Sequence, residues 1–449
     1  MSSNKIASSG WRTYQEGLRR ETRRDFLLYR LPVYALVVAV ILIFIFAGYH
    51  AGTFLSRLSP GASTRDQPKA TEEETCQAEY GEAIGAALAG MNFDPGSIAG
   101  SFVIDGAEPP AVAHTFLEPG LQRYIVKLLR RSRTLQAGVV VMKPSDGRIL
   151  AMAAYGDTND AGNLNVRAEF PAASLFKIVS AAAALDAAGF TPDRRVFYHG
   201  KRHTLYKGQL KKEEGKNASS TSFSRAFGSS INPVFGKLGI FHLGRELMTR
   251  YAERFYFNRT IPFDMNVAQS VAEVPSDDFG LAEVSSGFNK KTLISPLHAV
   301  LLAAAAANNG IIMKPRLIDY ISGPSEEILY RSRPQLLGDP ITRGAARDLR
   351  VLMKETVIRG TCRKRFRRLR RSKACADVDL GAKTGTINDT QDRYKFDWLV
   401  AYALPSNAEG AICLAVLGVH GEKLGIRATE LGSLIIRYHL KSLKVAGRD

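Results

Sequence analysis

The sequence lacks the groupings of residues that bind metals. Its eight histidines are scattered, and its four cysteines form no close cluster beside them. Structural zinc sites need four Cys or His ligands at characteristic spacings, and catalytic sites need three protein ligands. Isolated histidines are more often surface residues or hydrogen-bonded core residues. We therefore expect no metal and no cofactor.

Acidic residues are scarce as well, with 43 Asp and Glu against 61 Lys and Arg and a net charge of +18. Such a balance first suggests nucleic acid or an anionic surface as a partner. The excess is localised, however, because residues 1–30 hold seven Lys/Arg against three acids and residues 363–373 hold eight and none. These two segments account for +12 of the +18, so the rest of the chain is only mildly basic.

Charge is absent altogether between Leu31 and Leu55, where the residues are mostly aliphatic or aromatic. This run is long enough to cross a bilayer as one helix. A cleaved signal peptide is the main alternative, but the run is too long and begins about thirty residues into the chain. A buried core helix is a weaker alternative. Six arginines precede the run, and by the positive-inside rule this tail is cytoplasmic and the chain after about residue 56 is exported.

The rest of the chain shows no repeats. Residues 57–80 are polar and rich in breakers, which is typical of a tether. We expect a helix at 121–131, a β-hairpin over 137–153 with its turn at Pro144–Gly147, and mainly helices from 174 to about 310. Apolar strands follow at 398–404 and 411–418, and a last helix at 427–440. Strands on both sides of a helical block predict one sheet built from distant segments, with helices packed on it.

The segment from Pro171 to Leu185 predicts a helix with Ser174 and Lys177 in its first turns. Side chains three residues apart share one helix face, so the two can touch. A lysine against an apolar helix is poorly solvated, which favours the neutral amine that can accept a proton from a serine hydroxyl. The same pattern also fits a serine cap followed by a surface lysine, and only partners elsewhere can decide.

Two further motifs follow in order along the chain. The first is Ser230-x-Asn232, between two helical stretches, and the second is Lys383-Thr384-Gly385, just before the strand at 398–404. Neither motif is specific alone, since an edge strand can carry Lys-Thr-Gly by chance. All three in series predict acyl transfer, which needs an activated hydroxyl, a proton relay and preorganised donors for an oxyanion.

These motifs, their order and their flanks resemble the transpeptidase domain of penicillin-binding proteins, in the superfamily of serine acyl-enzymes that includes the serine β-lactamases. The resemblance covers roughly residues 115–440. It implies an α/β fold with an antiparallel central sheet flanked by helices and an all-helical subdomain inserted between about 190 and 290. The implied domains are a tail (1–30), a transmembrane helix (31–55), a stalk (56–114) and a catalytic domain (115–445).

The resemblance also implies a role for each motif residue. Ser174 would be the acylated nucleophile, Lys177 its base and Ser230 a proton relay. Asn232 would bind the peptide amide of the substrate. Lys383 and Thr384 would meet its terminal carboxylate, Gly385 would let the backbone approach, and the N–H groups of Ser174 and Thr386 would form the oxyanion hole. Where the family usually has Gly-Gln-Gly, this chain has Ser286-Gly-Phe-Asn289. The resemblance therefore does not determine which side chains line the cleft at this point.

The implied activity is D,D-transpeptidation that cross-links peptidoglycan stem peptides at a bacterial cell membrane, inhibited by β-lactams. A D,D-carboxypeptidase shares every motif and differs only in the acceptor. A penicillin-binding sensor or a non-catalytic scaffold is a further alternative, but a sensor would need a cytoplasmic output domain and a scaffold would not need all the motif side chains intact. Only residues 56–120 separate the membrane run from the helix at 121–131, too few for a glycosyltransferase domain. The implied partners are therefore the lipid-linked precursor, β-lactams, membrane lipid and a separate glycosyltransferase, and not nucleic acid.

Two features remain outside the motifs. Cys362 and Cys375 bracket the basic run 363–373, and in an exported protein such a pair favours a disulfide. The run itself fits a solvated insert (362–375), or a basic flap that attracts anionic wall polymer, lipid headgroups or a partner protein.

No Glu-x-x-x-Asn segment occurs in residues 233–382, so the water-activating base of class A β-lactamases is missing. We therefore expect a β-lactam target and not a β-lactamase.

Overall fold

The computed structural model describes residues 100–104, 110–156, 164–211 and 218–446, which all lie in the unit Glu72–Asp449. The basic tail, the predicted span 31–55 and most of the stalk fall outside these ranges. Within them, no helix is both long enough and apolar enough to cross a bilayer.

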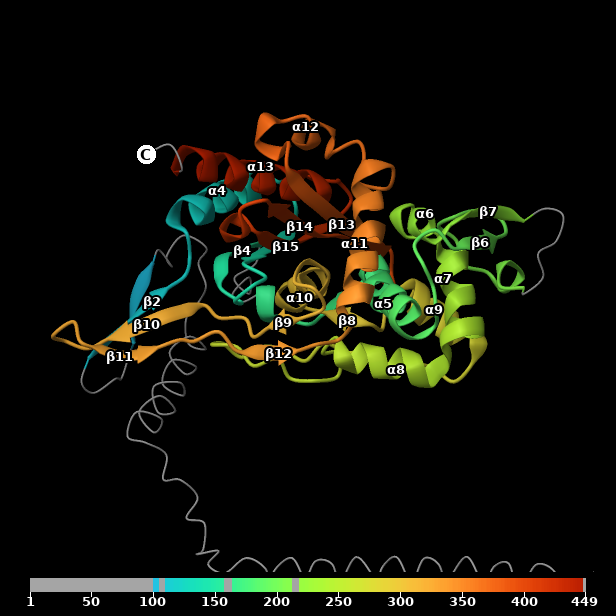
Figure 1. The fold of residues 1–449 in the computed structure, drawn as a ribbon, viewed down its shortest axis with the longest axis horizontal. Coiled ribbons are helices and arrows are strands. Elements are labelled where there is room, and N and C mark those ends of the chain that lie inside the picture. The colour runs from blue at the N-terminus through green and yellow to red at the C-terminus, as the bar shows by residue number, and fades with distance from the viewer. Residues whose placement is uncertain (1–99, 105–109, 157–163, 212–217, 447–449) are drawn as a thin grey trace, which may run out of the picture. The chain divides into compact units, whose positions relative to one another are not determined.

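A five-stranded antiparallel sheet forms the centre, in the order β13-β14-β15-β3-β4 (Figure 1). Its strands are β3 (Gln136–Met142), β4 (Ile149–Gly156), β13 (Val378–Asn388), β14 (Lys395–Pro405) and β15 (Ile412–His420). The predicted hairpin and both late strands are confirmed, and β13, which carries the Lys-Thr-Gly motif, lies at an edge of the sheet. Strands from the two ends of the domain meet where β15 pairs with β3.

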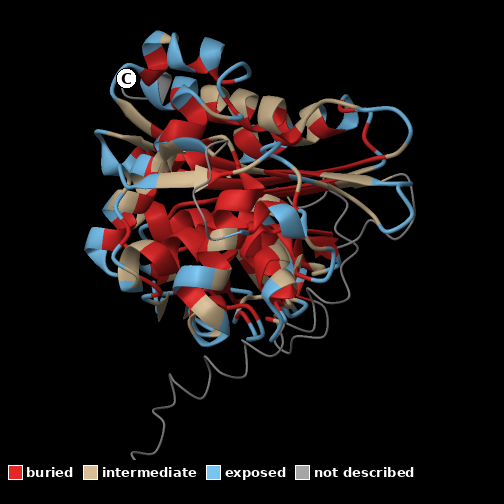
Figure 2. Ribbon diagram, turned by 90° about the vertical axis from the view of Figure 1, so that its right-hand side faces the viewer, coloured by how far each residue is buried: buried red, intermediate tan, exposed pale blue. Residues whose placement is uncertain are grey.

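Helices cover both faces of this sheet, which explains why its strands are apolar on both sides. On one face pack α4 (Pro119–Arg130) and α13 (Ala428–Ala446), and on the other α10 (Pro296–Ala307), with α5 (Lys177–Ala187) beyond. α11 (Arg343–Ile358) runs along the free edge of β13. Figure 2 shows the buried residues concentrated in the sheet and in the helices packed against it.

The inserted lobe is mainly helical but not wholly so. Its helices are α6 (Phe223–Gly228), α7 (Asn232–Leu238), the π-helical turn η5 (Gly239–Leu243), α8 (Gly244–Arg254) and α9 (Asp278–Ser286). It also contains the 3₁₀ turn η4 (Lys207–Gln209) and a two-stranded sheet of β6 (Arg195–Tyr198) and β7 (Ser219–Ser222). The expectation of an all-helical insert is therefore wrong in this detail.

A second antiparallel sheet, in the order β1-β2-β10-β11, was not predicted. It consists of β1 (Ser101–Ile104), β2 (Ala111–Thr115), β10 (Ile318–Ser322) and β11 (Ile328–Arg331). Two short pairs complete the strands, β5 (Phe170–Pro171) with β8 (Leu293–Ile294) and β9 (Ile312–Met313) with β12 (Leu336–Gly338). The described residues also form the 3₁₀ turns η2 (Leu164–Val166), η3 (Ala173–Phe176), η6 (Lys373–Cys375) and η7 (Ala408–Gly410).

The predicted disulfide between Cys362 and Cys375 is wrong, because both thiols are free and buried. The segment between them includes the short helix α12 (Arg367–Arg370). Phe366 and Leu369 are 0% and 1% exposed and belong to the same apolar cluster as the two cysteines. Burial of these side chains holds the basic segment against the domain without a covalent link.

Candidate active site

The loop that carries Ser174 is held by a contact from the central sheet and has a strained backbone. Ser174 lies in the 3₁₀ turn η3, and Lys177 is the first residue of α5, so the predicted helix begins as a tighter turn. The ring nitrogen of Trp398 on β14 donates to the carbonyl of Pro171 at 2.9 Å. Ala173 has a φ of 48°, which a non-glycine residue adopts only at a cost in strain. Such strain is typical of a loop fixed for function.

The Nζ of Lys177 lies 2.9 Å from the Oγ of Ser174. It is also within hydrogen-bond distance of the Oδ1 of Asn232, at 2.7 Å, and of the carbonyl of Ser286 at the end of α9. The Lys177 side chain is fully enclosed. The alternative of a serine cap and a surface lysine is therefore excluded, since Lys177 is buried and Ser174 caps no helix.

Burial lowers the pKa of Lys177 well below its ordinary value, because an ammonium group is costly away from water. The nearby positive charge of Lys383 lowers it further. Hydrogen bonds to the Asn232 oxygen and the Ser286 carbonyl fix the position of Nζ without adding a negative charge. The lowered pKa thus favours the neutral amine, which faces a serine hydroxyl.

The second motif connects α6 and α7. Ser230 has a φ of 53°, and Asn232 is the first residue of α7. The side-chain nitrogen of Asn232 donates to the backbone carbonyl of His203 at 3.1 Å. The side-chain oxygen of Asn232 is thereby directed at Lys177. The motif thus presents a hydroxyl and an amide to the same space.

The third motif closes the site from β13. The Nζ of Lys383 donates to the Oγ of Ser230 at 3.0 Å and to the carbonyl of Thr384 at 2.7 Å. Burial lowers the pKa of Lys383 to about 7. Ser174, Lys177 and Asn232 therefore form one hydrogen-bonded group, and Ser230 and Lys383 form a second. The five residues come from three separate stretches of the chain.

Gly385 lies where the backbones of β13 and the Ser174 turn meet. A Cβ added to Gly385 would lie 3.2 Å from the Cβ of Ala173 and 3.4 Å from the amide nitrogen of Ser174. The amide of Ser174 and the strand residues around Thr386 thus flank a common space, as an oxyanion hole requires. On this strand the hydroxyl of Thr386 donates to the carboxylate of Asp397 at 3.2 Å.

Several contributors have no signal in the sequence motifs. The Oγ of Ser180, one turn after Lys177, donates to the carbonyl of Ser285 at 2.7 Å and so links α5 to the end of α9. Asp397 is 2% exposed. Burial works to raise the pKa of Asp397, but nearby His420 and hydrogen bonds from Arg427 and the Ala428 amide lower it to about 2. Asp397 lies opposite Thr386 on the neighbouring strand, and this pairing is the one feature that could have suggested its contribution to the site.

No group of three His, Cys, Asp or Glu side chains in the described part of the chain is placed to hold a metal ion. The arrangement instead provides a serine hydroxyl beside a buried amine, a second hydroxyl beside a second amine, and backbone donors. These are the elements of a serine acyl-transfer site.

Residues 137–432 match the family model described as penicillin binding protein transpeptidase domain. The chain therefore belongs to this family, as its three motifs predicted.

Among curated proteins, the chain is similar to the stage V sporulation protein D of Bacillus subtilis, with 24% identity over 266 residues, 56% of this chain and 40% of that protein. It is also similar to the peptidoglycan D,D-transpeptidase PbpA of Mycolicibacterium smegmatis, with 25% identity over 317 residues, 63% of this chain and 62% of that protein. The chain thus spans less than two-thirds of the length of both relatives.

Solved structures share the fold. Penicillin-binding protein A of Mycobacterium tuberculosis, as its imipenem acyl-enzyme, matches with a TM-score of 0.61 and 24% identity, over 73% of this chain and 79% of that one. Penicillin-binding protein 3 of the same organism, in its apo form, matches with a TM-score of 0.61 and 18% identity, over 74% of this chain and 81% of that one. The expected α/β transpeptidase fold, with antiparallel sheet and flanking helices, is confirmed.

Proposed function

We propose that this protein is a D,D-transpeptidase that cross-links peptidoglycan stem peptides through an acyl-enzyme on Ser174. The observation that supports it most directly is the fully buried Lys177 amine, 2.9 Å from the Ser174 hydroxyl and with a lowered pKa. A neutral amine at this distance can take the hydroxyl proton as the oxygen attacks a carbonyl.

In this mechanism Ser174 Oγ attacks the carbonyl carbon of the penultimate D-Ala, and its proton passes to Lys177. The backbone N–H groups of Ser174 and Thr386 stabilise the oxyanion. The C–N bond then breaks, and the departing D-Ala amine receives a proton through Ser230, whose hydroxyl is held by Lys383. The amine of a second stem peptide attacks the ester, and its proton passes back through the same relay and Lys177 to the Ser174 oxygen as the ester C–O bond breaks.

The substrate ends in a free carboxylate, which Lys383 and the Thr384 hydroxyl would receive. Asn232 would hold the peptide amide. A penicillin presents a carboxylate and a strained amide in the same relation, so it would acylate Ser174 and stay bound.

Intact-mass analysis after brief exposure to a labelled penicillin tests the proposal. We expect one adduct, mapped to Ser174, and none in Ser174→Ala. An adduct that survives this change would disprove the assignment of the nucleophile. Incubating lipid-linked precursor with and without an amine acceptor then distinguishes the activities. Cross-linked product supports a transpeptidase, whereas D-Ala release without cross-linking would identify a carboxypeptidase.

We further propose that residues 31–55 anchor the protein in a bacterial cell membrane, with the tail cytoplasmic and the catalytic domain outside. The charge-free run and the arginines before it support this topology. Glycan synthesis would then fall to a separate glycosyltransferase acting on the same lipid-linked precursor.

A further inference from the structure

The basic segment 363–373 forms a defined surface on the folded domain, which we call the basic platform. Phe366 and Leu369 anchor it in the apolar cluster beneath. The hydroxyl of Ser433 on α13 donates to the carbonyl of Arg365 at 3.4 Å, and Lys444 donates to the carbonyl of Lys373 at 2.7 Å. Its eight cationic side chains are all exposed: Arg363, Lys364, Arg365, Arg367, Arg368, Arg370, Arg371 and Lys373.

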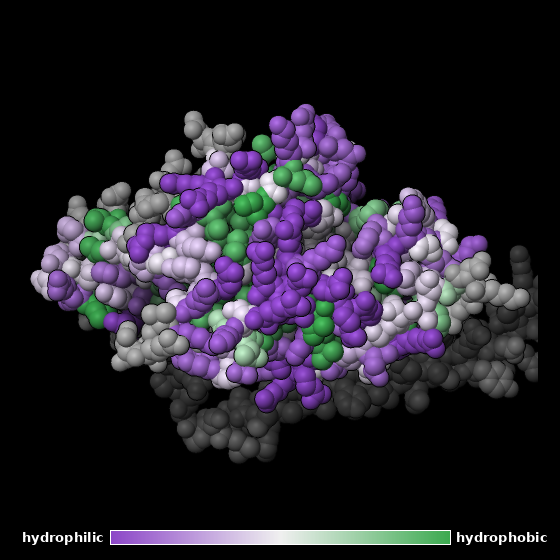
Figure 3. All heavy atoms as spheres, turned by 90° about the horizontal axis from the view of Figure 1, so that it is seen from above, coloured by the Kyte–Doolittle hydropathy of each residue, from purple (hydrophilic) through white to green (hydrophobic). Residues whose placement is uncertain are grey.

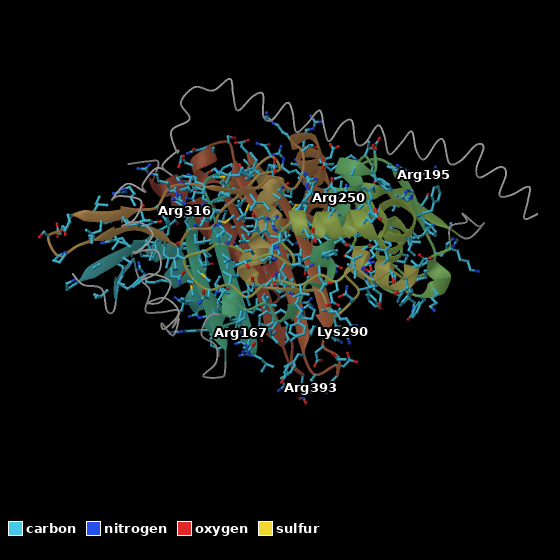
Figure 4. The ribbon with its side chains drawn as sticks, turned by 90° about the horizontal axis from the view of Figure 1, so that it is seen from below. Arg167, Arg195, Arg250, Lys290, Arg316 and Arg393 are labelled. Atoms are coloured by element: carbon cyan, nitrogen blue, oxygen red, sulfur yellow. The ribbon has the colours of Figure 1, made fainter. Side chains whose placement is uncertain are left out.

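The charge of the platform is almost uncompensated. Arg365 pairs with Glu430 at 2.8 Å, and the other seven cations form no ion pair with any described residue. Figure 3 looks down on the face that carries α12, and hydrophilic side chains dominate it. Elsewhere basic residues are dispersed, as Figure 4 shows for Arg195, Arg250 and Arg393. A cluster of like charges on an anchored segment repels itself, so an anion bound there would relieve an existing cost.

The platform also adjoins the active site. The hydroxyl of Thr361, two residues before its first arginine, lies 2.7 Å from the hydroxyl of Thr384 in the third motif. The next residue, Cys362, is close enough to Lys383 to interact with it electrostatically. Thr361 is exposed and Thr384 is partly so. An extended ligand can therefore pass from Thr384 over Thr361 to the platform without leaving the surface.

We propose that the basic platform binds the carboxylate-bearing stem peptides of an un-cross-linked peptidoglycan strand beside the one in the active site. The proposal rests on the proposed function, in which Thr384 receives the carboxylate of one stem peptide. A glycan strand carries such peptides repeatedly, so further carboxylates lie next to the bound one. Six of the eight platform cations are arginine, whose guanidinium binds carboxylates in a bidentate manner. Repeated arginines beside a carboxylate subsite match repeated carboxylates along a polymer.

The test compares two fourfold neutralisations in the full chain, held in neutral phosphatidylcholine nanodiscs. One changes Arg367, Arg368, Arg370 and Arg371 to Gln. The matched control changes Arg123, Lys127, Arg130 and Arg131 to Gln, four exposed cations on and just after α4, on the same side of the sheet. Binding is measured with Ser174→Ala in each chain, to prevent turnover. The probes are un-cross-linked strands, the same strands stripped of peptides, phosphatidylglycerol vesicles and duplex DNA.

We expect neutralisation of the platform to weaken binding of peptide-bearing strands about tenfold or more, with little effect of the control. Added salt should weaken binding to the unchanged platform and affect the neutralised chain less. Equal losses in both variants, or no loss in either, would refute the proposal. So would an equally large dependence on the platform for stripped strands, vesicles or DNA.

Penicillin acylation in chains that retain Ser174 separates this proposal from the proposed function. A small penicillin does not reach the platform, so acylation should be equal in all three chains. Absence of acylation from the unchanged protein would refute the proposed function, whatever the binding results. Normal acylation, together with strand binding that does not change when the platform is neutralised, would refute the role of the platform in binding but not the proposed function.

Discussion

At the scale of single residues, the site depends on two buried lysines, and the charge of Lys383 lowers the affinity of Lys177 for a proton. Both are fully enclosed, and each Nζ lies over an aromatic ring, Lys177 at 5.4 Å from the centroid of Phe235 and Lys383 at 5.5 Å from that of Phe227. Burial is the main cause of both pKa shifts, and the charge of Lys383 adds to the shift of Lys177. Protonating one therefore opposes protonating the other.

Replacing Lys383 with methionine should move the pH dependence of acylation. The base must be neutral, so the rate rises with pH through the pKa of Lys177. Without the charge of Lys383 that pKa rises, and the acid limb should shift to higher pH. It should stay below the ordinary lysine value, because burial remains. The measurement is the penicillin acylation rate against pH, read for the position of the limb, since loss of Lys383 also weakens carboxylate binding. A limb that stays in place or moves down would contradict the coupling.

The penicilloyl-enzyme should persist for many minutes. Rapid hydrolysis needs a base that activates water, and none of the described hydrogen-bond partners of the Lys177 amine is a carboxylate. Asn232, held toward Lys177 at 2.7 Å, offers a polar contact and not a base. An amine acceptor should resolve the natural acyl-enzyme faster. Rapid catalytic loss of nitrocefin colour, at many turnovers per enzyme, would instead indicate a β-lactamase.

The motif side chains could be predicted because each has a fixed residue type and neighbourhood in the sequence. The Ser286 carbonyl could not, since any residue supplies a carbonyl and its direction depends on where α9 ends. Ser180 has the same difficulty, because a serine inside an alanine-rich helix gives no sign of a partner more than a hundred residues away.

At the scale of elements, the end of α9 and the Ser174 turn are fitted backbone to backbone. Gly287 ends α9 with a φ of 61°, and a Cβ there would lie 2.0 Å from the carbonyl oxygen of Ala173. Only glycine allows this approach. The same helix end brings the Ser286 carbonyl to Lys177. The departure from the usual Gly-Gln-Gly thus retains a glycine where the structure needs one.

Changing Gly287 to alanine should slow penicillin acylation about 100-fold, because the Ser174 turn must shift by a large part of an ångström. The control is Gly189→Ala after α5, where φ is 63° and a Cβ would meet nothing within 4 Å. That change should cost about 1 kcal/mol of stability through backbone strain, with acylation unchanged. Acylation rates and thermal unfolding of both variants give the answer. Equal acylation in the two would show that the close contact has no role in catalysis.

Two errors of prediction also belong to this scale. The spacing of Phe366 and Leu369 places both on one face of a short helix, which indicates a segment anchored by apolar side chains. The prediction relied instead on the paired cysteines and so proposed a disulfide. The sheet β1-β2-β10-β11 had no comparable signal. Its central pair joins β2 to β10 across about two hundred residues of chain, and short strands give weak periodicity.

At the scale of the whole molecule, all the motif residues lie in the unit Glu72–Asp449, whereas the predicted anchor lies before it. The +18 charge divides in a corresponding way, with one excess in the tail before the apolar run and another in the basic platform. In the proposed topology the two excesses lie on opposite sides of the membrane. The tail would set the orientation of the protein in the membrane, and the platform would bind substrate.

A fragment that begins at Glu72 should therefore appear in the soluble fraction and acylate as fast as the full chain, which should sediment with membranes. Deleting residues 1–30 alone should leave the apolar run and membrane association, but weaken the bias of orientation, because the six arginines are lost. Cell fractionation measures the first effect, and protease protection in inverted vesicles the second. Full-length protein in the soluble fraction would contradict the anchor. A membrane-bound fragment from Glu72 onward would place the membrane contact in the catalytic domain instead.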